Sequence, residues 1–399
     1  MPADGIRLLT TDASKLIMKS VAIAGSTGSI GRQALQVISD SPGYFEVTAI
    51  GANSNVALLV EQAKRFHPKF VCLFDESFKN ELIQEVPVGS EVVCGKDSIQ
   101  VLSEAADLIL NAIVGFAGIS VTLNSLKLNK ILALANKESL VAGGDVVDKI
   151  KRESLGEIIP VDSEHSAIFQ CLKNENTRSV DKILLTGSGG PFRGRKAFEL
   201  GNVTIADALN HPTWNMGPKI TVDSSTLMNK ALEIIEARYL FGVSVQDIDV
   251  VIHPQSIVHS MVNFKDGTTI AQLAMPTMCL PISYALNYPD RGNVPYGTLD
   301  FVAGLDLSFE GPDKQVFRSL DFAYEAGTIG RSLPTIVNAA NEVAVDAFLS
   351  GKIKWLSIFD VVEHCMNSCE VTDLQSVEDV VNSDFNSRHT AVAFVNGLT

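Results

Sequence analysis

The sequence predicts an α/β protein with a parallel-sheet domain first, an α+β middle domain next and a helical bundle domain at the C-terminus. Three observations support this prediction. Short apolar runs alternate with amphipathic helical segments over 20–161, strand-like runs surround one long helix over 162–290, and helical patterns with few strand signals fill 313–399. A chain of 399 residues is long enough to form two or three hydrophobic cores.

The first domain follows a tail, residues 1–19, which we expect to be loose or disordered because it has no apolar segment of the kind found in signal peptides. Beyond it, the expected strands are 21–24, 45–51, 70–74, 107–115, 130–136 and 157–161. Strands that are apolar on both faces and separated by helices form mostly parallel, doubly wound sheets. We therefore expect a Rossmann-like domain over 20–161.

The middle domain, 162–290, contains the remaining strand signals and a strong helical pattern over 224–241. The sequence Lys-Asp-Gly at 265–267 separates two alternating runs and is typical of a hairpin turn. A stretch rich in proline and glycine, 291–312, indicates a linker before the helical domain, 313–399.

Charge and cysteine content limit the classes of partner. The formal net charge is −14, so we expect no nucleic-acid partner, because phosphates require a basic surface. The most apolar stretch, 108–121, is interrupted by Asn111 and by glycines and is shorter than the ~20 residues of a membrane helix, so we expect no membrane partner. Six scattered cysteines in mostly apolar settings favour reduced thiols and a cytoplasmic location.

The sequence AGSTGSIG at 24–31 follows the first strand and begins the first helix. Gly25, Gly28 and Gly31 are spaced GxxGxxG, which lets the backbone approach a pyrophosphate while free N–H groups at the helix start stabilise its charge. The alternative is a tight turn without a ligand, but the βαβ context favours a dinucleotide site. The second strand ends in Asn53, Ser54 and Asn55 without an acid for a ribose 2′-hydroxyl, so NADP is favoured over NAD.

Two acids follow the strand 157–161 in the sequence VDSEH. Residues i and i+2 of an extended chain point the same way, so Asp162 and Glu164 can direct two carboxylates at one point. Oxygen ligands suit Mg²⁺ or Mn²⁺, and such a site needs a third acid from elsewhere. A helix cap formed by Asp162 or Ser163 explains the same residues, and the local sequence leaves both interpretations open.

A third acid is available on the predicted helix 224–241. Asp223 or Ser224 resembles an N-cap, and Asn229, Lys230 and Glu233 fall on one face of the helix. A cation, an amide and a carboxylate on one face can hold a phosphate beside a metal. A solvated face with an i,i+3 ion pair is the alternative, and Glu236 is a competing acid on the same helix.

Three further segments are unusual for purely structural loops. ALANKESL, 133–140, places Asn-Lys-Glu at the end of a strand, where open α/β sheets bind ligands. TGSGG, 186–190, exposes Ser188 among glycines and either binds phosphate or merely turns. HPTWNMGPK, 211–219, carries Trp214 and Met216 and is either a lid that excludes water or a loop anchored by a buried tryptophan.

Taken together, these segments resemble the 1-deoxy-D-xylulose 5-phosphate reductoisomerase family. The resemblance rests on GSTGSIG, ANKE, VDSEHSAIFQ, LTGSGGPFR, HPTWNMGPKITVDSSTLMNKALEIIEA and HPQSIVHSMV, which run from residue 25 to about 262 in the expected order. It implies that an enzyme with NADPH and Mg²⁺ or Mn²⁺ isomerises and reduces 1-deoxy-D-xylulose 5-phosphate to 2-C-methyl-D-erythritol 4-phosphate, an isoprenoid precursor. It also implies a homodimer, with the middle sheet as one possible interface.

The resemblance assigns roles motif by motif. It implies metal ligands at Asp162, Glu164 and Glu233, with Lys137, His165 and His211 as further catalytic candidates. The implied substrate contacts, which include the metal ligands Glu164 and Glu233, are Lys137, Ser163, Ser188, His211, Trp214, Met216, Ser224, Asn229, Lys230 and His259. Cofactor positions are expected at Gly25, Thr27, Gly28, Ser29, Ile30, Asn53, Ser54, Asn55, Asn136, Glu138 and Gly217.

The sequence departs from the family pattern in two places. The segment Asn53–Asn55 lacks the basic residue that many relatives carry there, and Pro218 replaces a residue that is often basic. The sequence alone gives no role for His165. Two rival functions remain at this stage, an NADP-dependent dehydrogenase without isomerisation and a non-catalytic NADP(H) sensor. The first does not need three convergent carboxylates, and the second leaves the lid unexplained.

Overall fold

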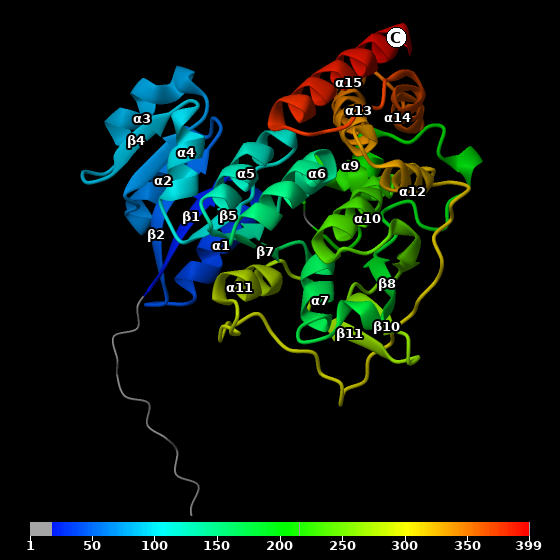
Figure 1. The fold of residues 1–399 in the computed structure, drawn as a ribbon, viewed down its shortest axis with the longest axis horizontal. Coiled ribbons are helices and arrows are strands. Elements are labelled where there is room, and N and C mark those ends of the chain that lie inside the picture. Colours follow the sequence, from blue (N-terminus) through cyan, green and yellow to red (C-terminus); the bar gives the residue numbers. More distant parts are fainter. Residues whose placement is uncertain (1–17, 215, 399) are drawn as a thin grey trace, which may run out of the picture.

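The computed structural model describes residues 18–214 and 216–398, and its first half is a seven-stranded parallel sheet (Figure 1). The strand order is β4-β3-β2-β1-β5-β6-β7, so the predicted parallel α/β fold is confirmed. The strands are β1 Lys19–Ala24, β2 Phe45–Ala52, β3 Phe70–Leu73, β4 Glu91–Cys94, β5 Leu108–Asn111, β6 Ile131–Leu134 and β7 Glu157–Pro160. The order reverses at β1, which lies between β2 and β5, and such a switch point opens a crevice for ligands.

Helices cover both faces of this sheet and bury a separate hydrophobic core on each (Figure 1). One core joins the sheet to α1 Ser29–Ser39, α2 Val56–Phe66, α3 Lys79–Glu85 and α11 Cys279–Asn287. The other joins it to α4 Asp97–Glu104, α5 Ile119–Lys127 and α6 Glu138–Glu153. Each fully buried Ile, Leu or Val contributes about 1.5–3 kcal/mol. Although α11 comes late in the sequence, it packs beside α1 and completes the first core.

The second sheet has four strands in the order β11-β10-β8-β9. Its strands are β8 Val180–Gly187, β9 Ile248–Ile252, β10 Val258–Phe264 and β11 Thr269–Leu273. The predicted hairpin is confirmed, since β10 and β11 pair antiparallel and Gly267 in the turn has φ +87°. Helix α7, Ser163–Cys171, packs against β10 and β11 and links the two sheets.

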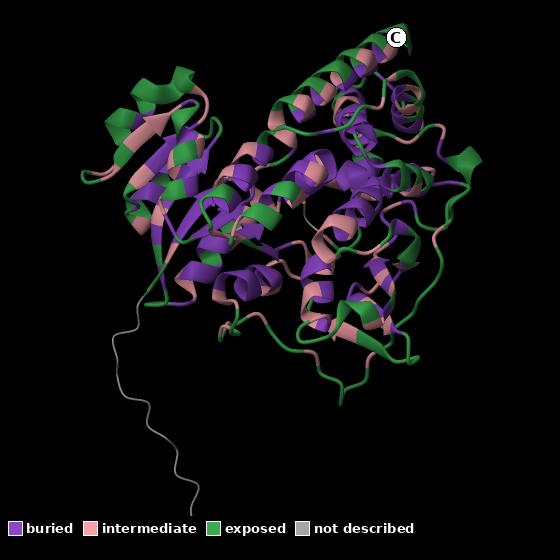
Figure 2. Ribbon diagram, viewed as in Figure 1, coloured by how far each residue is buried: buried purple, intermediate pink, exposed green. Residues whose placement is uncertain are grey.

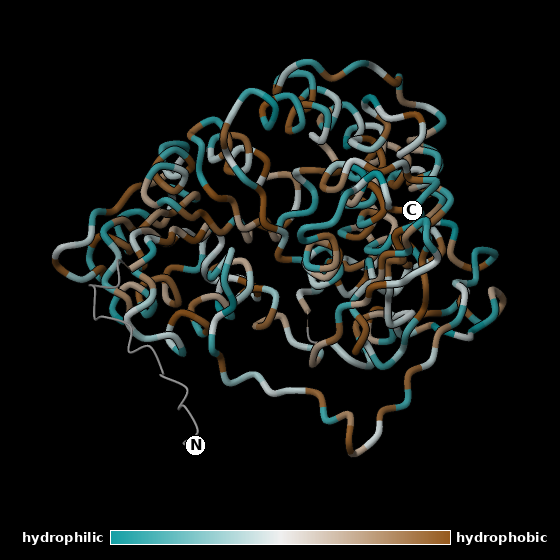
Figure 3. The backbone as a smooth tube through the Cα atoms, turned by 60° about the horizontal axis from the view of Figure 1, so that its bottom comes forward, coloured by the Kyte–Doolittle hydropathy of each residue, from teal (hydrophilic) through white to brown (hydrophobic). Residues whose placement is uncertain are grey.

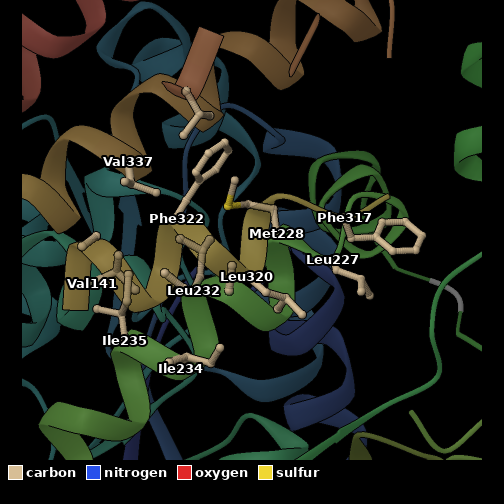
Figure 4. Packing of buried hydrophobic residues seen from close by; sticks show 14 of the residues in the cluster. Val141, Leu227, Met228, Leu232, Ile234, Ile235, Phe317, Leu320, Phe322 and Val337 are labelled. Carbon is tan, nitrogen blue, oxygen red and sulfur yellow. The ribbon is translucent and has the colours of Figure 1, made fainter. Parts of the chain in front are cut away.

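The C-terminal part is helical, as predicted, and shares its core with the middle of the chain. It consists of α12 Ser319–Ile329, α13 Leu333–Leu349, α14 Ser357–Ser368 and α15 Val377–Leu398. Helices α12, α14 and α15 pack against α13, and α12 also packs against α10, Met228–Phe241. In this shared core Met228 lies beside Phe322 and Ile235 beside Val141 (Figure 4). Helices α10 and α13 are therefore mostly buried, while α15 keeps an exposed outer face (Figure 2).

The remaining elements are short. They are α8 Ile205–Leu209, α9 Pro218–Ser225 and 3-10 turns at Glu76–Phe78, Phe116–Gly118, Thr177–Ser179, Ala197–Glu199 and Val245–Asp247. Residues 291–309 form no helix or strand and project from the body as an extended arm (Figures 1 and 3). Of the predicted tail, residues 1–17 lie outside the described part, and β1 already begins at Lys19. Among the described helices, none has both the length and the hydropathy to cross a membrane.

The structure corrects one predicted helix. Residues 224–241 are not continuous, because Leu227 adopts a left-handed conformation (φ 57°) between α9 and α10. Asp223 and Ser224 are therefore not an N-cap but lie in the last turn of α9. The prediction was wrong because the apolar spacing runs across the break without interruption. The sequence reasoning also missed β4, whose four residues are too few to show a period.

Candidate active site

The two acids of VDSEH lie where β7 ends and α7 begins. Asp162 is the N-cap of α7, and its Oδ1 accepts a hydrogen bond from the Glu164 N–H at 3.2 Å. The cap interpretation is therefore correct, and it does not exclude a site. The Ser163 hydroxyl donates to Glu164 Oε2, so the first turn of α7 holds both carboxylates in place.

A third carboxylate reaches the same point from α10. Oxygens of Asp162, Glu164 and Glu233 all lie within 4.8 Å of one another, and Glu233 is fully buried. The structure thus brings together the three acids that the sequence singled out from distant segments. An all-oxygen carboxylate set of this kind fits Mg²⁺ or Mn²⁺ rather than zinc.

Two lysines surround the three carboxylates. Lys137 Nζ lies 2.8 Å from Asp162 Oδ2 and 3.1 Å from Glu233 Oε1, and Lys230 Nζ lies 2.7 Å from Glu164 Oε1 and also contacts Glu233. Burial disfavours both ammonium groups, but the carboxylates outweigh it and hold the pKa of Lys137 well above its usual value. The same effect raises the pKa of Lys230 to about 12. Three carboxylates against two ammonium groups leave an excess negative charge that a cation can neutralise.

The pKa values of the carboxylates diverge. Burial works against the charged form of Asp162, but Lys137 and His165 overcome it and lower its pKa well below the usual range. Burial and the nearby Asp162 charge instead raise the pKa of Glu233. The charged form of Glu233 therefore depends on its positive neighbours, Lys137 and Lys230.

His165 lies behind the carboxylates, fully buried. Its Nδ1 is 3.3 Å from Asp162 Oδ1 and 3.4 Å from Glu236 Oε2, and its Nε2 is 3.0 Å from the carbonyl oxygen of Glu233. Burial alone lowers the pKa of His165, but Glu236 and Asp162 raise it to about 9. His165 and the competing acid Glu236 also lie close enough to Asp162 to form a second group of possible ligands, but the raised pKa of His165 favours a ring with protons on both nitrogens.

Ser188 faces the same region from the end of β8. Its hydroxyl lies 3.1 Å from His211 Nε2, and it accepts a hydrogen bond from the Gly190 N–H at 3.2 Å. His211 Nδ1 accepts hydrogen bonds from the N–H groups of Thr213 and Trp214, so Nε2 carries the proton and donates to Ser188. Burial lowers the pKa of His211, which favours this neutral form.

The Ser188 loop approaches α9 and α10 closely enough to require glycine. A Cβ on Gly190 would lie 2.5 Å from the carbonyl oxygen of Ser224, and one on Gly187 would lie 2.9 Å from Lys230 Cε. The loop that carries Ser188 therefore lies against Ser224, which is at the end of α9 and not at a helix start, and against Lys230 on α10. Asn229 precedes Lys230 on α10, and its Oδ1 accepts a hydrogen bond from Lys137 Nζ at 2.8 Å.

The predicted lid contacts Ser188 through His211 and lies beside β10 through Trp214. Its Trp214 ring lies 6.4 Å from the ring of His259, which comes from β10 and is 5% exposed. Burial lowers the pKa of His259 to about 4, so this ring is neutral near pH 7. Met216 and Gly217 precede α9, and the last two residues assigned to the lid, 218 and 219, are already helical. Asn215 lies outside the described residues.

The glycine turn after β1 forms the other half of the site. Gly28 caps α1 without a side-chain hydrogen bond, so the N–H groups of the first turn, at Ser29 and Ile30, face no side-chain cap. Ser26 Oγ donates to Gln62 Oε1 at 2.7 Å, and this bond anchors the turn, which includes Thr27, to α2. Free helix N–H groups beside a glycine turn fit a pyrophosphate.

The residues after β2 differ in what they can offer a cofactor. Asn53 and Ser54 are exposed, whereas Asn55 Oδ1 caps α2 by accepting a hydrogen bond from the Leu58 N–H at 3.2 Å. Asp75, at the end of β3, donates its N–H to Asn53 O, but its carboxylate accepts from Ser77. No acid follows β2 directly, in agreement with the prediction for NADP.

A buried ionic cluster connects the two halves. Lys219 Nζ lies 2.8 Å from Glu138 Oε1 and 2.9 Å from Asp223 Oδ2, and Asn136 Nδ2 donates to Glu138 Oε2 at 3.0 Å. The sequence reasoning placed Lys219 in the lid without a role and missed Asn341, which donates to Asp223 Oδ1 at 2.8 Å. Lys219 and Asp223 are four residues apart, a spacing that could have indicated the pair once α9 was recognised.

Known protein families match nearly the whole chain. Residues 21–144 match the family model described as 1-deoxy-D-xylulose 5-phosphate reductoisomerase. Residues 158–241 match that described as its C-terminal domain, and 273–390 match DXP reductoisomerase C-terminal domain.

Curated relatives and solved structures agree. The proteins named 1-deoxy-D-xylulose 5-phosphate reductoisomerase from Chloroherpeton thalassium and Phocaeicola vulgatus are 48% and 47% identical, over 93% and 95% of this chain and 97% and 99% of theirs. The Zymomonas mobilis enzyme in complex with NADPH has a TM-score of 0.89 at 39% identity, covering 95% of this chain and 99% of its own. A DOX-P reductoisomerase in complex with NADPH, fosmidomycin and magnesium has a TM-score of 0.90 at 36% identity, covering 95% and 98%.

Proposed function

The chain belongs to the 1-deoxy-D-xylulose 5-phosphate reductoisomerase family, and on this premise we propose how its site carries out the family's reaction. The protein is an NADP-dependent oxidoreductase that converts 1-deoxy-D-xylulose 5-phosphate into 2-C-methyl-D-erythritol 4-phosphate in isoprenoid precursor synthesis. NADPH and a divalent metal are its cofactors. The observation that carries this function is the convergence of three carboxylates beside two lysines.

The metal ligands in this proposal are Asp162, Glu164 and Glu233. A bound divalent cation supplies Lewis acidity that polarises a carbonyl and stabilises the negative charge that develops on its oxygen, and bound NADPH supplies the reducing hydride. His165 lies behind Asp162, where its Nδ1 is 3.3 Å from Asp162 Oδ1 and 3.4 Å from Glu236 Oε2, so a protonated ring stabilises the Asp162 carboxylate. The ammonium of Lys137 lies beside Asp162 and Glu233, where it can stabilise an oxyanion of the rearranging substrate.

The phosphate of the substrate binds where Ser188, Ser224, Asn229 and Lys230 meet. Two hydroxyls, an amide and an ammonium offer the donors that phosphate oxygens need. Ser163 and His211 border the carbon chain of the substrate, and Trp214 and Met216 cover it beside His259. Binding energy from the phosphate closes this lid and excludes water from the reacting carbons.

The proposed cofactor cleft follows the glycine turn. Gly25, Thr27, Gly28, Ser29 and Ile30 surround the pyrophosphate, and Asn53, Ser54 and Asn55 lie at the adenosine end. Because Asn55 Oδ1 is engaged in capping α2, this residue has only its amide NH₂ to offer a 2′-phosphate. Asn136, Glu138 and Gly217 form the end of the cleft that faces the metal ligands.

Mixing the protein with NADPH, Mg²⁺ and 1-deoxy-D-xylulose 5-phosphate should consume NADPH, as measured by the loss of its absorbance. EDTA should abolish this consumption, and added Mg²⁺ or Mn²⁺ should restore it, because an all-carboxylate site releases its cation to a chelator. Consumption that is unaffected by EDTA would contradict the metal assignment. NADPH binding without consumption would contradict catalysis.

A homodimer is the second part of the proposal. In the described residues, β11 pairs with β10 on one side and with no strand on the other, and unpaired sheet edges invite pairing. The neighbouring arm exposes apolar side chains, with Phe301 61% and Val302 99% exposed. A second copy that covers the β11 edge and the arm would bury both.

Light scattering should therefore give the mass of two chains. Replacing Ile270 on β11 with Lys, together with Val302→Asp, should shift the mass to that of one chain. The matched control, Val88→Lys, changes a fully exposed apolar residue far from β11 and should leave the dimer intact. A wild-type mass of one chain at micromolar concentration overturns this part of the proposal.

The cellular location proposed for this enzyme is the cytoplasm. Its support is that the six cysteines, at positions 72, 94, 171, 279, 365 and 369, are free thiols, which suits a reducing compartment.

A further inference from the structure

We propose that Lys219 is a positioning residue that couples the cofactor cleft to the lid, an inference that rests on the proposed function of both. Lys219 touches neither the proposed metal ligands nor the substrate contacts in the described structure. It acts through Glu138, on the cofactor side, and through the first turn of α9, which begins directly after the lid.

The first step of the argument is the charge balance of the cluster. Lys219 is the cation shared by Glu138 and Asp223, at 2.8 and 2.9 Å, and the two carboxylates are 5% and 1% exposed. Burial works against the Lys219 ammonium, but Asp223 and Glu138 outweigh it and raise its pKa above the usual value. Without this ammonium, the buried carboxylates of Glu138 and Asp223 would repel each other, and α9 would move away from the start of α6.

The second step is the connection to the cofactor cleft. Glu138 begins α6 and accepts a hydrogen bond from Asn136, whose Nδ2 also donates to Gly115 O at 2.8 Å. The segment after β5 that leads to Gly115 also borders the glycine turn, since a Cβ on Gly25 would lie 2.6 Å from the carbonyl oxygen of Ala112. A continuous chain of contacts therefore runs from the glycine turn to Lys219.

The third step is the connection to the lid. Lys219 is the second residue of α9, and Gly217 and Pro218 alone separate it from Met216. The hydrogen bonds from Thr221 Oγ1 to Gly217 O, at 3.0 Å, and to Met216 O, at 3.4 Å, fix the end of the lid to this helix. Any movement of Glu138 on cofactor binding is therefore transmitted to the segment that carries Trp214.

The far end of the cluster is fixed. Asp223 accepts a hydrogen bond from Asn341 on α13, and the next residue, Glu342, accepts from the Phe116 N–H at 3.1 Å and from Arg388 on α15. The C-terminal helices thus hold both α9 and the loop after β5. Because Asn341 holds the Asp223 end of α9, a displacement of Glu138 changes the position of the Lys219 end of α9.

The experiment compares Lys219→Met with Lys219→Arg in the full-length protein. Binding of NADP⁺ is measured by titration calorimetry, and accessibility of the lid by acrylamide quenching of tryptophan fluorescence. Quenching reports on Trp214, because the chain has two tryptophans and the other, Trp355, is 1% exposed. NADP⁺ should reduce quenching in the wild type. The steady-state KM for NADPH and kcat are measured for the same proteins.

We expect Lys219→Met to weaken NADP⁺ binding about tenfold or more and to abolish its effect on Trp214 quenching, since typical couplings between sites are about 5- to 150-fold. Lys219→Arg should retain most of both effects, because it keeps the charge. The double variant Lys219→Met/Asp223→Asn, which removes one charge of each sign, should fold like the wild type and still lose the coupling. Wild-type NADP⁺ protection of Trp214 in this double variant overturns the inference.

The matched control is Val222→Ala. Val222 lies on α9 and is fully buried, so its truncation loosens the helix without touching the ionic cluster. If Val222→Ala abolishes NADP⁺ protection of Trp214 as Lys219→Met does, Lys219 has only a structural role and the inference fails. Wild-type protein that binds NADP⁺ but does not turn over 1-deoxy-D-xylulose 5-phosphate contradicts the proposed function instead, so the two failures are distinguishable.

Discussion

Glu233→Gln should lower kcat roughly a thousandfold. This is the upper end of the roughly hundredfold to thousandfold losses seen when one group that stabilises transition-state charge is removed. Gln keeps the size of the side chain but removes its negative charge. Both oxygens of Glu233 are engaged by Lys137 and Lys230, and its carboxylate lies within 4.8 Å of Asp162 and Glu164. The variant therefore loses a proposed metal ligand and leaves two buried ammonium groups with one counter-ion fewer.

NADPH should still bind to this variant, because the proposed pyrophosphate site is on the glycine turn after β1 and not on α10. Kinetics at rising Mg²⁺ and direct titration with NADPH separate the two effects. The control is Glu85→Gln, since Glu85 forms a surface ion pair with Lys64 and both side chains are more than half exposed. A near-normal kcat with an unchanged Mg²⁺ requirement in Glu233→Gln would refute the assignment of the third ligand.

The predictable part of the fold is the part with a strong local period. The six expected strands of the first sheet, the hairpin around 265–267 and the helical C-terminus follow from apolar spacing and turn residues, and the structure confirms them. The break at Leu227 was not predictable from spacing, because a single left-handed residue leaves the apolar period intact. Helix α11 was not predicted, and its packing beside α1 is a long-range contact that no local pattern records.

The site shows the same division. The sequence was enough to group the three acids Asp162, Glu164 and Glu233, because each lies at a recognisable strand end or on a recognisable helix face. The role of His165 could not be predicted from the sequence, because it depends on Glu236, whose Oε2 lies 3.4 Å from His165 Nδ1 and comes from a different helix. The ionic cluster around Lys219 was also not predicted as a whole, since its five members come from α6, α9 and α13 and from the turn before α6. The sequence shows where a charged side chain lies along its helix or strand, but it does not show which buried charged side chains from different helices contact one another.

The geometry fits the proposal that one site holds a metal, a phosphate and a dinucleotide. Lys137 follows β6 of the parallel sheet, Glu233 and Lys230 lie on α10, and Ser188 follows β8 of the second sheet. The proposed metal ligands and the proposed phosphate contacts therefore come from three parts of the fold and adjoin at Lys230, which contacts Glu164 and Glu233. The three carboxylates lie within 4.8 Å of one another, and the ammonium groups of Lys137 and Lys230 offset most of their mutual repulsion.

The glycine turn permits a second test with a large effect, in which two neighbouring glycines give different outcomes. Gly31→Ala should both destabilise the protein and abolish NADPH binding. A Cβ on Gly31 would lie 2.3 Å from Gly25 O and 2.5 Å from Ser26 Cα, so the turn has to open. Overpacking of this kind lowers the free energy of unfolding by about 1–3 kcal/mol.

Gly28→Ala should instead fold normally and bind NADPH more weakly. Its φ is −73°, and the nearest atom to an added Cβ, Gly25 O, lies 3.3 Å away, so the methyl group fits the protein but narrows the approach of a pyrophosphate. Thermal unfolding and NADPH titration distinguish the two variants. Gly201→Ala is the control, because a Cβ there meets no atom within 4 Å and should change neither measurement. Wild-type NADPH affinity in both Gly28→Ala and Gly31→Ala would mean that the cofactor does not bind at this turn, because the first methyl group narrows the approach of a pyrophosphate and the second forces the turn open.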